Sequence, residues 1–259
     1  MSLRTIIVIG VIACATINVA AQSVDSRFVV SANVGVQAQS TSRTDVANFD
    51  LNREVGVVRA TQTLGPYLLV DAGGSIRLWK RLGIGLAVSH AQGSAAAAIE
   101  ADVPHPFFFE FDRAVMGSRS GLRHREVAYH FLGQFHIPLS STTLVTVSGG
   151  PTYFDASQEL VAEVRTSERG FPFEEIDLVS TEVERVSAAA WGYNVGLDLA
   201  YWGSRFNLFQ RLGLPDRVGV GVGVRYSWAK PNLDLRGLRQ ERALQVGVAH
   251  VVGGVRVGF

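Results

Sequence analysis

The sequence has almost no cysteine and little charge. Its one Cys among 259 residues excludes a disulfide scaffold, a zinc ribbon and an iron–sulfur site, because each of these needs several thiols. Only 18% of the residues are charged, against about 25% in an average soluble domain. The 24 basic residues nearly cancel the 23 acidic ones, so we expect neither a nucleic-acid partner nor an acidic disordered tail. Glycine, in contrast, is frequent at 27 residues, which disfavours a helical protein.

Motifs for catalysis are lacking as well. No GxSxG, P-loop, HExxH or Rossmann fingerprint occurs in a credible context. The chain has six His residues, and none is spaced from Ser or Asp in a way that predicts a nucleophile–base pair. Each His is expected to be a polar filler of an interior or a loop. We therefore predict that the protein is not an enzyme and has no catalytic residue, cofactor or metal site.

Residues 1–21 have the pattern of a secretory signal peptide. A basic residue precedes the uncharged apolar run 6–19, and small residues up to Ala21 precede a polar segment. The run is shorter than the ~20 apolar residues that a membrane-spanning helix needs. We predict cleavage after Ala21 and a single mature domain at 22–259. A lipoprotein modified at Cys14 is the alternative, although it would leave an apolar stretch at the start of the mature chain.

Beyond this leader, apolar residues alternate with small or polar ones, which is typical of β-strands with two different faces. In 217–228, RVGVGVGVRYSW, every second residue is Val, Tyr or Trp. The other alternating segments lie at 28–39, 68–78, about 83–96, 126–137, about 144–154, 190–202 and 242–259. In the last segment the phase slips, which predicts a bulge near Ala249 and His250. The pattern predicts eight strands of roughly 10–14 residues, about the length that crosses a bilayer in a tilted barrel.

The connections between these predicted strands differ in length. Polar or charged stretches, which we predict to be loops, lie at about 41–65, 100–125, 165–185, 203–217 and 234–241. Only short turns remain at 80–82 and 139–143. Long extracellular loops and short periplasmic turns are the habit of bacterial outer-membrane barrels.

The polar face of the predicted strands is rich in glycine and carries few charges. Such a face suits the narrow interior of an eight-stranded barrel better than a water-facing surface. The predicted fold is therefore all-β, a closed antiparallel eight-stranded transmembrane β-barrel. Aromatic residues cluster near the predicted strand ends, at Tyr67, Trp79, Trp191, Tyr193, Tyr201, Trp202, Tyr226 and Trp228. Several of them lie on the outward phase, as an interfacial girdle needs. Buried charges need partners, so we predict a lumen charge network of Asp71, Arg77, Glu126, Asp198, Arg225 and Arg256.

The last predicted strand is amphipathic and ends in an aromatic residue. Val255, Val257 and Phe259 share its apolar face, and such an ending resembles the assembly signal of bacterial outer-membrane proteins. With the leader and the eight strands, the mature chain resembles small barrels of the OmpA/OmpX type, without a periplasmic domain. This resemblance implies localisation in the bacterial outer membrane, contact with its lipids, and recognition of the last strand by the barrel-assembly machinery.

Three functions are compatible with such a barrel. We favour a non-enzymatic structural or surface-interaction role, with a small passive channel or a lipid-active enzyme as alternatives. The most unusual segment is 104–111, PHPFFFEF. Its phenylalanines are expected to fold onto the barrel rim or to dip into the outer leaflet, although exposed apolar patches also mark interaction sites. The sequence names no loop partner.

Overall fold

The computed structural model describes residues 26–37, 40–203, 217–229, 232–233, 242–243 and 249–259. Within these residues every regular element is a β-strand, which confirms the all-β class. None of the described segments forms a helix long and apolar enough to cross a membrane. The predicted signal peptide, including Cys14, lies outside the described residues, as do most of the stretches predicted to be loops at 203–217 and 234–241.

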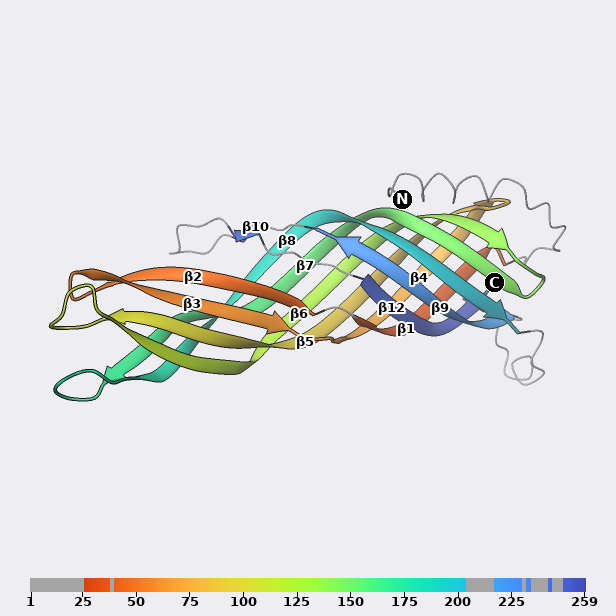
Figure 1. Cartoon of the computed structure of the whole chain (residues 1–259). Helices are drawn as coiled ribbons and strands as arrows, with labels where there is room; N and C mark the ends of the chain where they lie inside the picture. Colours follow the sequence, from red (N-terminus) through yellow and green to blue (C-terminus); the bar gives the residue numbers. More distant parts are fainter. Residues whose placement is uncertain (1–25, 38–39, 204–216, 230–231, 234–241, 244–248) are drawn as a thin grey trace, which may run out of the picture.

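Twelve strands follow one another along the described chain (Figure 1). They are β1 (Phe28–Gln37), β2 (Thr41–Leu51), β3 (Glu54–Leu64), β4 (Leu68–Trp79), β5 (Leu82–Pro104), β6 (Asp112–Pro138), β7 (Thr143–Glu168), β8 (Ile176–Trp202), β9 (Arg217–Trp228), β10 (Asn232–Leu233), β11 (Arg242–Ala243) and β12 (Ala249–Gly258).

Eight of these strands close into a hydrogen-bonded ring. Every neighbouring pair in the ring is antiparallel, in the order β1, β4, β5, β6, β7, β8, β9 and β12. The ring closes where β1 pairs with β12, with Val30 opposite Val257. The predicted pairing of the first and last strands is thus confirmed.

The predicted strand lengths are wrong for half of the ring. β5 to β8 have 23 to 27 residues each and continue far beyond the ring on one side. Three stretches predicted to be loops therefore consist mainly of strand. The first, 41–65, contains the β2–β3 hairpin, and the second and third leave only 105–111 and 169–175 between strands. Charge misled the prediction, because a strand that lies in water on one face carries charged residues there as a loop does.

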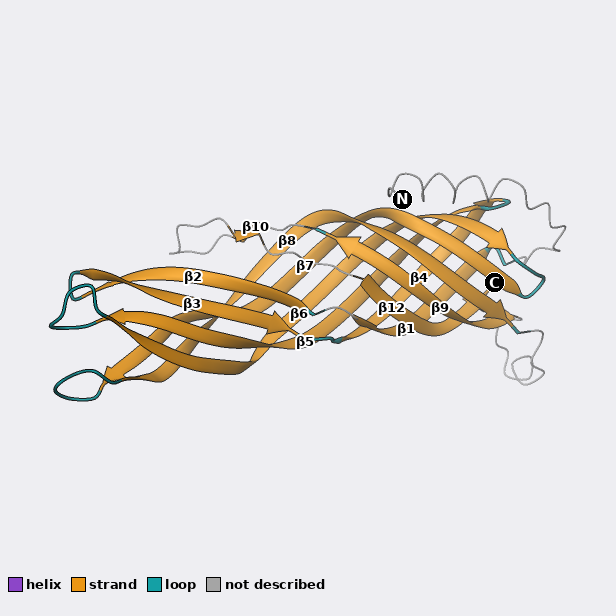
Figure 2. Cartoon of the chain, in the orientation of Figure 1, coloured by secondary structure: helices purple, strands orange, loops and turns teal. Residues whose placement is uncertain are grey.

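The extended strands form a second unit, which we call the arm. It consists of β2, β3 and the parts of β5 to β8 that lie beyond the ring (Figure 1). β3 pairs with β5 over Val57–Leu64, so β2, β3, β5 and β6 make one sheet. The β7–β8 hairpin packs on it through Ile176 and Leu178, which contact a buried cluster of Ala101, Val103 and Val115. Strands make up almost the whole arm, with short loops at its far end (Figure 2).

The two faces of the ring differ sharply. Apolar side chains on its outer face are exposed, among them Leu68, Ile84, Leu86, Phe131, Val195, Leu197, Val220 and Val255. Of the eight aromatic residues near the predicted strand ends, Trp79, Trp191, Tyr193, Tyr201 and Tyr226 are exposed on this face. Tyr67 and Trp202 are instead buried. Trp202 occupies an inward position at the end of β8, and Tyr67 lies directly before β4.

The predicted bulge near Ala249 and His250 is not found in the described residues. β12 pairs with β9 in unbroken register from Ala249 opposite Tyr226 to Gly258 opposite Arg217. The residues before Ala249, over which the apolar phase changes, lie outside the described residues.

Candidate functional site

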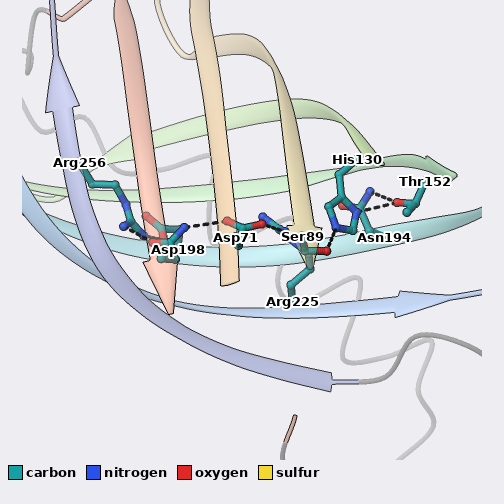
Figure 3. A network of polar contacts seen from close by, with 9 residues as sticks. Asp71, Ser89, His130, Thr152, Asn194, Asp198, Arg225 and Arg256 are labelled. Carbon is teal, nitrogen blue, oxygen red and sulfur yellow. Dashed lines mark hydrogen bonds and ion pairs between the residues drawn. The ribbon is translucent and has the colours of Figure 1, made fainter. Parts of the chain in front are cut away.

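The ring interior holds a network of polar side chains contributed by all eight strands of the ring (Figure 3). We call it the interior network. It has two parts, an ionic chain and a chain centred on His130. The ionic chain consists of Asn33, Asp71, Asp198, Arg225 and Arg256, and the second chain of Ser89, His130, Thr152 and Asn194.

Two ion pairs joined by an amide make up the ionic chain. Arg225 Nη1 lies 2.6 Å from Asp71 Oδ2, and Asn33 Nδ2 donates to Asp71 Oδ1 at 2.8 Å. The guanidinium of Arg256 then donates both to the Asn33 amide oxygen and to the Asp198 carboxylate. Asp71 is 1% exposed and Arg256 4%. Because buried charges without partners are strongly unfavourable, these contacts stabilise a polar interior.

Strand register and glycine bring these groups together. Asn33 lies opposite Asp71 in the β1–β4 pair, so two inward-facing positions meet directly. Glycines on β9 leave room for the longer side chains. A Cβ at Gly221 would lie 2.8 Å from Arg256 Cζ, and one at Gly223 would lie 3.0 Å from Asp198 Oδ2. The alternating glycines of β9 therefore form the space in which the ionic chain lies.

The second chain runs from Ser89 to Asn194. Ser89 Oγ is 3.0 Å from His130 Nε2, and Thr152 Oγ1 is 2.9 Å from His130 Nδ1. Asn194 Nδ2 donates to Thr152 Oγ1 at 2.7 Å. All four side chains are buried, so both nitrogens of this imidazole are satisfied inside the ring.

The contact between Ser89 and His130 was missed by the sequence reasoning, which found no nucleophile–base pair. The two residues are 41 positions apart and meet because β5 and β6 pair antiparallel, with Ala87 opposite His130. Alternation alone places both on the interior face, and only the register shows that they touch. A hydroxyl rather than a carboxylate lies on the other imidazole nitrogen, and neither Ser89 nor His130 lines the interior cavity described below. The arrangement resembles a structural hydrogen-bond chain more than a catalytic one.

Of the six charges predicted to form a network, four lie in the ionic chain. Arg77 lines the same cavity as these four. Glu126 is buried elsewhere in the interior, with its carboxylate 3.9 Å from His124 Nε2. The structure thus brings Asp71, Asp198, Arg225 and Arg256 together, with Arg77 on the same cavity and Glu126 elsewhere in the interior.

The interior is filled to different degrees on the two sides of the network. Toward the short turns there is a cavity of about 110 Å³, lined by residues that include Arg77, His136, Thr146 and Trp202. Toward the arm, apolar side chains pack together in the interior: Leu64, Tyr67, Leu69, Ala91, Leu122 and Val252. These side chains, which we call the apolar layer, lie beside buried polar groups, since the ring of Tyr67 is 5.5 Å from that of His124.

The outer face of the arm carries a charged row next to the ring. Arg123 donates its backbone N–H to Glu159 Oε2 at 3.0 Å, and Arg185 Nη2 lies 3.4 Å from Glu159 Oε1. This backbone hydrogen bond, together with the two arginines, lowers the pKa of Glu159 below its usual value.

The residues of the predicted assembly signal lie on β12 and directly after it. Val255 and Phe259 are exposed on the outer face. Phe259 forms backbone hydrogen bonds with Phe28, and the two rings are 6.0 Å apart. Phe259 therefore extends the seam between β1 and β12.

No model of a protein family matches the chain, and no curated protein does. Among the described residues, no group of three or more His, Cys, Asp or Glu side chains could hold a metal ion.

Proposed function

We propose that this protein is an integral outer-membrane β-barrel, closed to solutes, that presents its arm at the cell surface in a non-enzymatic structural or surface-interaction role. The observation that carries the proposal is the inversion of the ring, which exposes apolar side chains outside and buries ion pairs inside. A ring in water would bury the apolar face instead.

The dimensions of the ring support a bilayer as its solvent. The strands that lie wholly within the ring, β1, β4, β9 and β12, have 10 to 12 residues. A membrane-crossing strand needs about 9–11 residues at a tilt of about 45°. In this orientation outer-membrane lipids cover the apolar belt, the short turns face the periplasm, and the arm projects outward.

The interior supports an anchor rather than a channel. An eight-stranded barrel is just wide enough for side chains to fill it, and here the interior network and the apolar layer occupy the interior. On the same proposal, the barrel-assembly machinery recognises Val255, Val257 and Phe259, as the resemblance to OmpA/OmpX-type barrels implies.

The test is fractionation followed by reconstitution. We expect the full-length protein in the outer-membrane fraction, and on unheated gels we expect a compact form that shifts after boiling. In planar bilayers the purified protein should give no steady conductance. Recovery as soluble periplasmic protein would refute the membrane proposal, and stable ion currents would favour the passive channel instead.

A further inference from the structure

Five exposed phenylalanines gather at the far end of the arm, on the loops 105–111 and 169–175. They are Phe107, Phe108, Phe109, Phe111 and Phe171, with exposed fractions between 53% and 87%. The rings of Phe107 and Phe173, which lie on different loops, are 5.6 Å apart. Together with the β2–β3 turn at Asn52 and Arg53, these two loops form what we call the tip.

The tip lies far from the ring. From Gln92, the last β5 residue paired with β4, the strand runs 12 residues to Pro104, which is about 40 Å along the strand. The expectation that these phenylalanines fold onto the barrel rim or dip into the protein's own leaflet is therefore wrong. The reason is that β5 and β6 continue as paired strands and carry the loop away from the ring (Figure 1).

Buried polar side chains hold the two loops in place. Arg113, 4% exposed, donates to the carbonyl oxygens of Phe173 at 2.8 Å and Pro104 at 3.0 Å, and also to the Glu168 carboxylate. His105, 2% exposed, accepts the backbone N–H groups of Phe107 and Phe108 through Nδ1. The tip is thus ordered before any partner arrives, which lowers the entropy lost on binding.

The backbone of the tip is also unusual. Among the described residues, the non-glycine residues with positive φ are Asn52, Arg53, Glu110 and Phe173. All four belong to the three tip segments. L-residues rarely adopt this conformation, and such strained positions cluster at binding sites.

Negative charge surrounds the phenylalanines. Seven exposed carboxylates border the tip, at Asp50, Glu110, Asp112, Glu168, Glu174, Glu175 and Asp177, together with two exposed arginines, Arg53 and Arg169. Glu168 is paired with Arg113, and Glu175 and Asp177 with Arg169, which leaves the other four carboxylates in excess. This excess disfavours an anionic membrane as the occupant, since interfacial segments carry Lys and Arg beside their aromatic residues. It also disfavours a second copy of the same tip, because like charges would face each other.

We propose that the tip docks a protein partner whose apolar surface is bordered by lysine and arginine side chains. Rigid aromatic side chains are typical anchors of protein interfaces, and the surrounding carboxylates would attract and orient a basic rim. The inference rests on the proposed function, because the barrel must hold the arm outside the cell for a partner to reach it.

The experiment uses full-length protein in nanodiscs of zwitterionic lipid, after the boiling shift has shown that the barrel is folded. The probe is a labelled amphipathic helical peptide of leucine and lysine, with a leucine–glutamate peptide for comparison and empty nanodiscs as the blank. We expect binding of the lysine peptide alone, weakened by salt. The double variant Phe109→Ser, Phe171→Ser should lower the affinity about tenfold, whereas the variant Glu110→Gln, Glu174→Gln should mainly reduce the salt dependence.

A matched control removes two exposed apolar side chains from the sides of the arm. Met116 and Val179 are 78% and 63% exposed, and Met116→Ser with Val179→Ser should leave peptide binding unchanged. The proposal is overturned if the phenylalanine variant and this control lose peptide affinity equally, or if the wild type shows no binding above the blank. So does Phe-dependent binding of anionic vesicles in place of the peptide, or Phe-dependent self-association. Absence of the boiling shift would instead count against the proposed barrel.

Discussion

At the scale of single residues, the stability of the ring interior depends on paired charges, because removal of one partner leaves the other buried without a counter-ion. Asp71 is almost completely buried and bonds through both of its oxygens. Asp198 retains 30% of its side-chain exposure, so water can partly replace its partner. Burial of this kind, rather than the number of contacts, decides how much each carboxylate stabilises the interior.

Asp71→Asn should therefore lower the free energy of unfolding in detergent by about 3 kcal/mol, because Arg225 keeps a buried charge without its counter-ion. Asp198→Ala should destabilise the protein less. Neither variant should conduct ions, since the apolar layer on the arm side stays in place. The double variant Asp71→Asn, Arg225→Met is the control and should recover much of the loss. Thermal unfolding of all four proteins measures this, and equal effects at the two aspartates would contradict it.

The charged row on the arm makes stability depend on pH. The pKa of Glu159 is lowered, so its ionised form is favoured by folding. Its contribution is present above the pKa of the unfolded chain and disappears as the pH falls through the lower pKa of the folded protein. A carboxyl-carbon NMR titration should give a midpoint below the usual 4.5. Arg185→Gln should move this midpoint upward, and a wild-type midpoint of 4.5 or more would refute the assignment.

At the scale of elements, long strands perform two tasks in succession. Within the ring, β5 to β8 present apolar residues outward, and beyond it the same faces become polar, as at Gln92, Ser94 and Glu100 of β5. The inward phase stays buried from Ala87 to Val103, except at the half-buried Gly93. Each strand therefore continues without a break while the surroundings of its outer face change.

The hydrogen bonds of Arg113, which we call the clamp, should stabilise the tip loops without affecting the stability of the ring. Arg113→Met removes three hydrogen bonds that link the two tip loops. Asn52 still donates to the Pro104 carbonyl oxygen at 3.4 Å, but Phe173 and Glu168 lose this donor, at a local cost of about 1–3 kcal/mol. We expect faster amide hydrogen exchange at 105–111 and 169–175 and unchanged thermal unfolding of the ring.

The control for this prediction is Arg59→Met. Arg59 forms an exposed ion pair with Asp102 on the same arm, with 45% and 38% side-chain exposure. Exposed pairs contribute little, about 0–1 kcal/mol, so exchange at the tip should stay at the wild-type level. Equal acceleration in both variants would show that the clamp has no special role.

At the scale of the whole molecule, closure of the ring depends on the close approach of β1 and β12. A Cβ at Gly254 would overlap the carbonyl oxygen of Ala32 on the neighbouring strand and crowd Asn33. At the adjacent Gly253, the nearest atom to a new Cβ is Gly221 O at 3.8 Å. A methyl group therefore fits at Gly253 but not at the neighbouring Gly254.

Gly254→Ala should accordingly destabilise the ring by about 1–3 kcal/mol, as overpacking does elsewhere, and should reduce the compact form on unheated gels. Gly253→Ala should behave like the wild type. The fraction of protein that shifts on boiling measures both. A normal compact form for Gly254→Ala would mean that β12 can move away from β1 without loss of closure.

Alternation and composition determined much of this protein by themselves. The period of two predicts strands, and the phase correctly places Asp71 and Arg256 inside and Val220 and Val255 outside, because successive side chains of a strand point to opposite faces. The eight alternating segments contribute the eight strands of the ring. The exposed phenylalanines of 104–111 also stand out from the sequence alone.

Register and strand continuation were decided only by the tertiary structure. Ser89 and His130 are 41 positions apart and touch because of the register between their strands. Alternation shows that both side chains point inward, but it carries no information on register. Charged stretches such as 100–125 were assigned to loops because charge reports contact with water and not backbone conformation. Pairing between β5 and β6 extends these residues into the arm and carries the tip away from the ring.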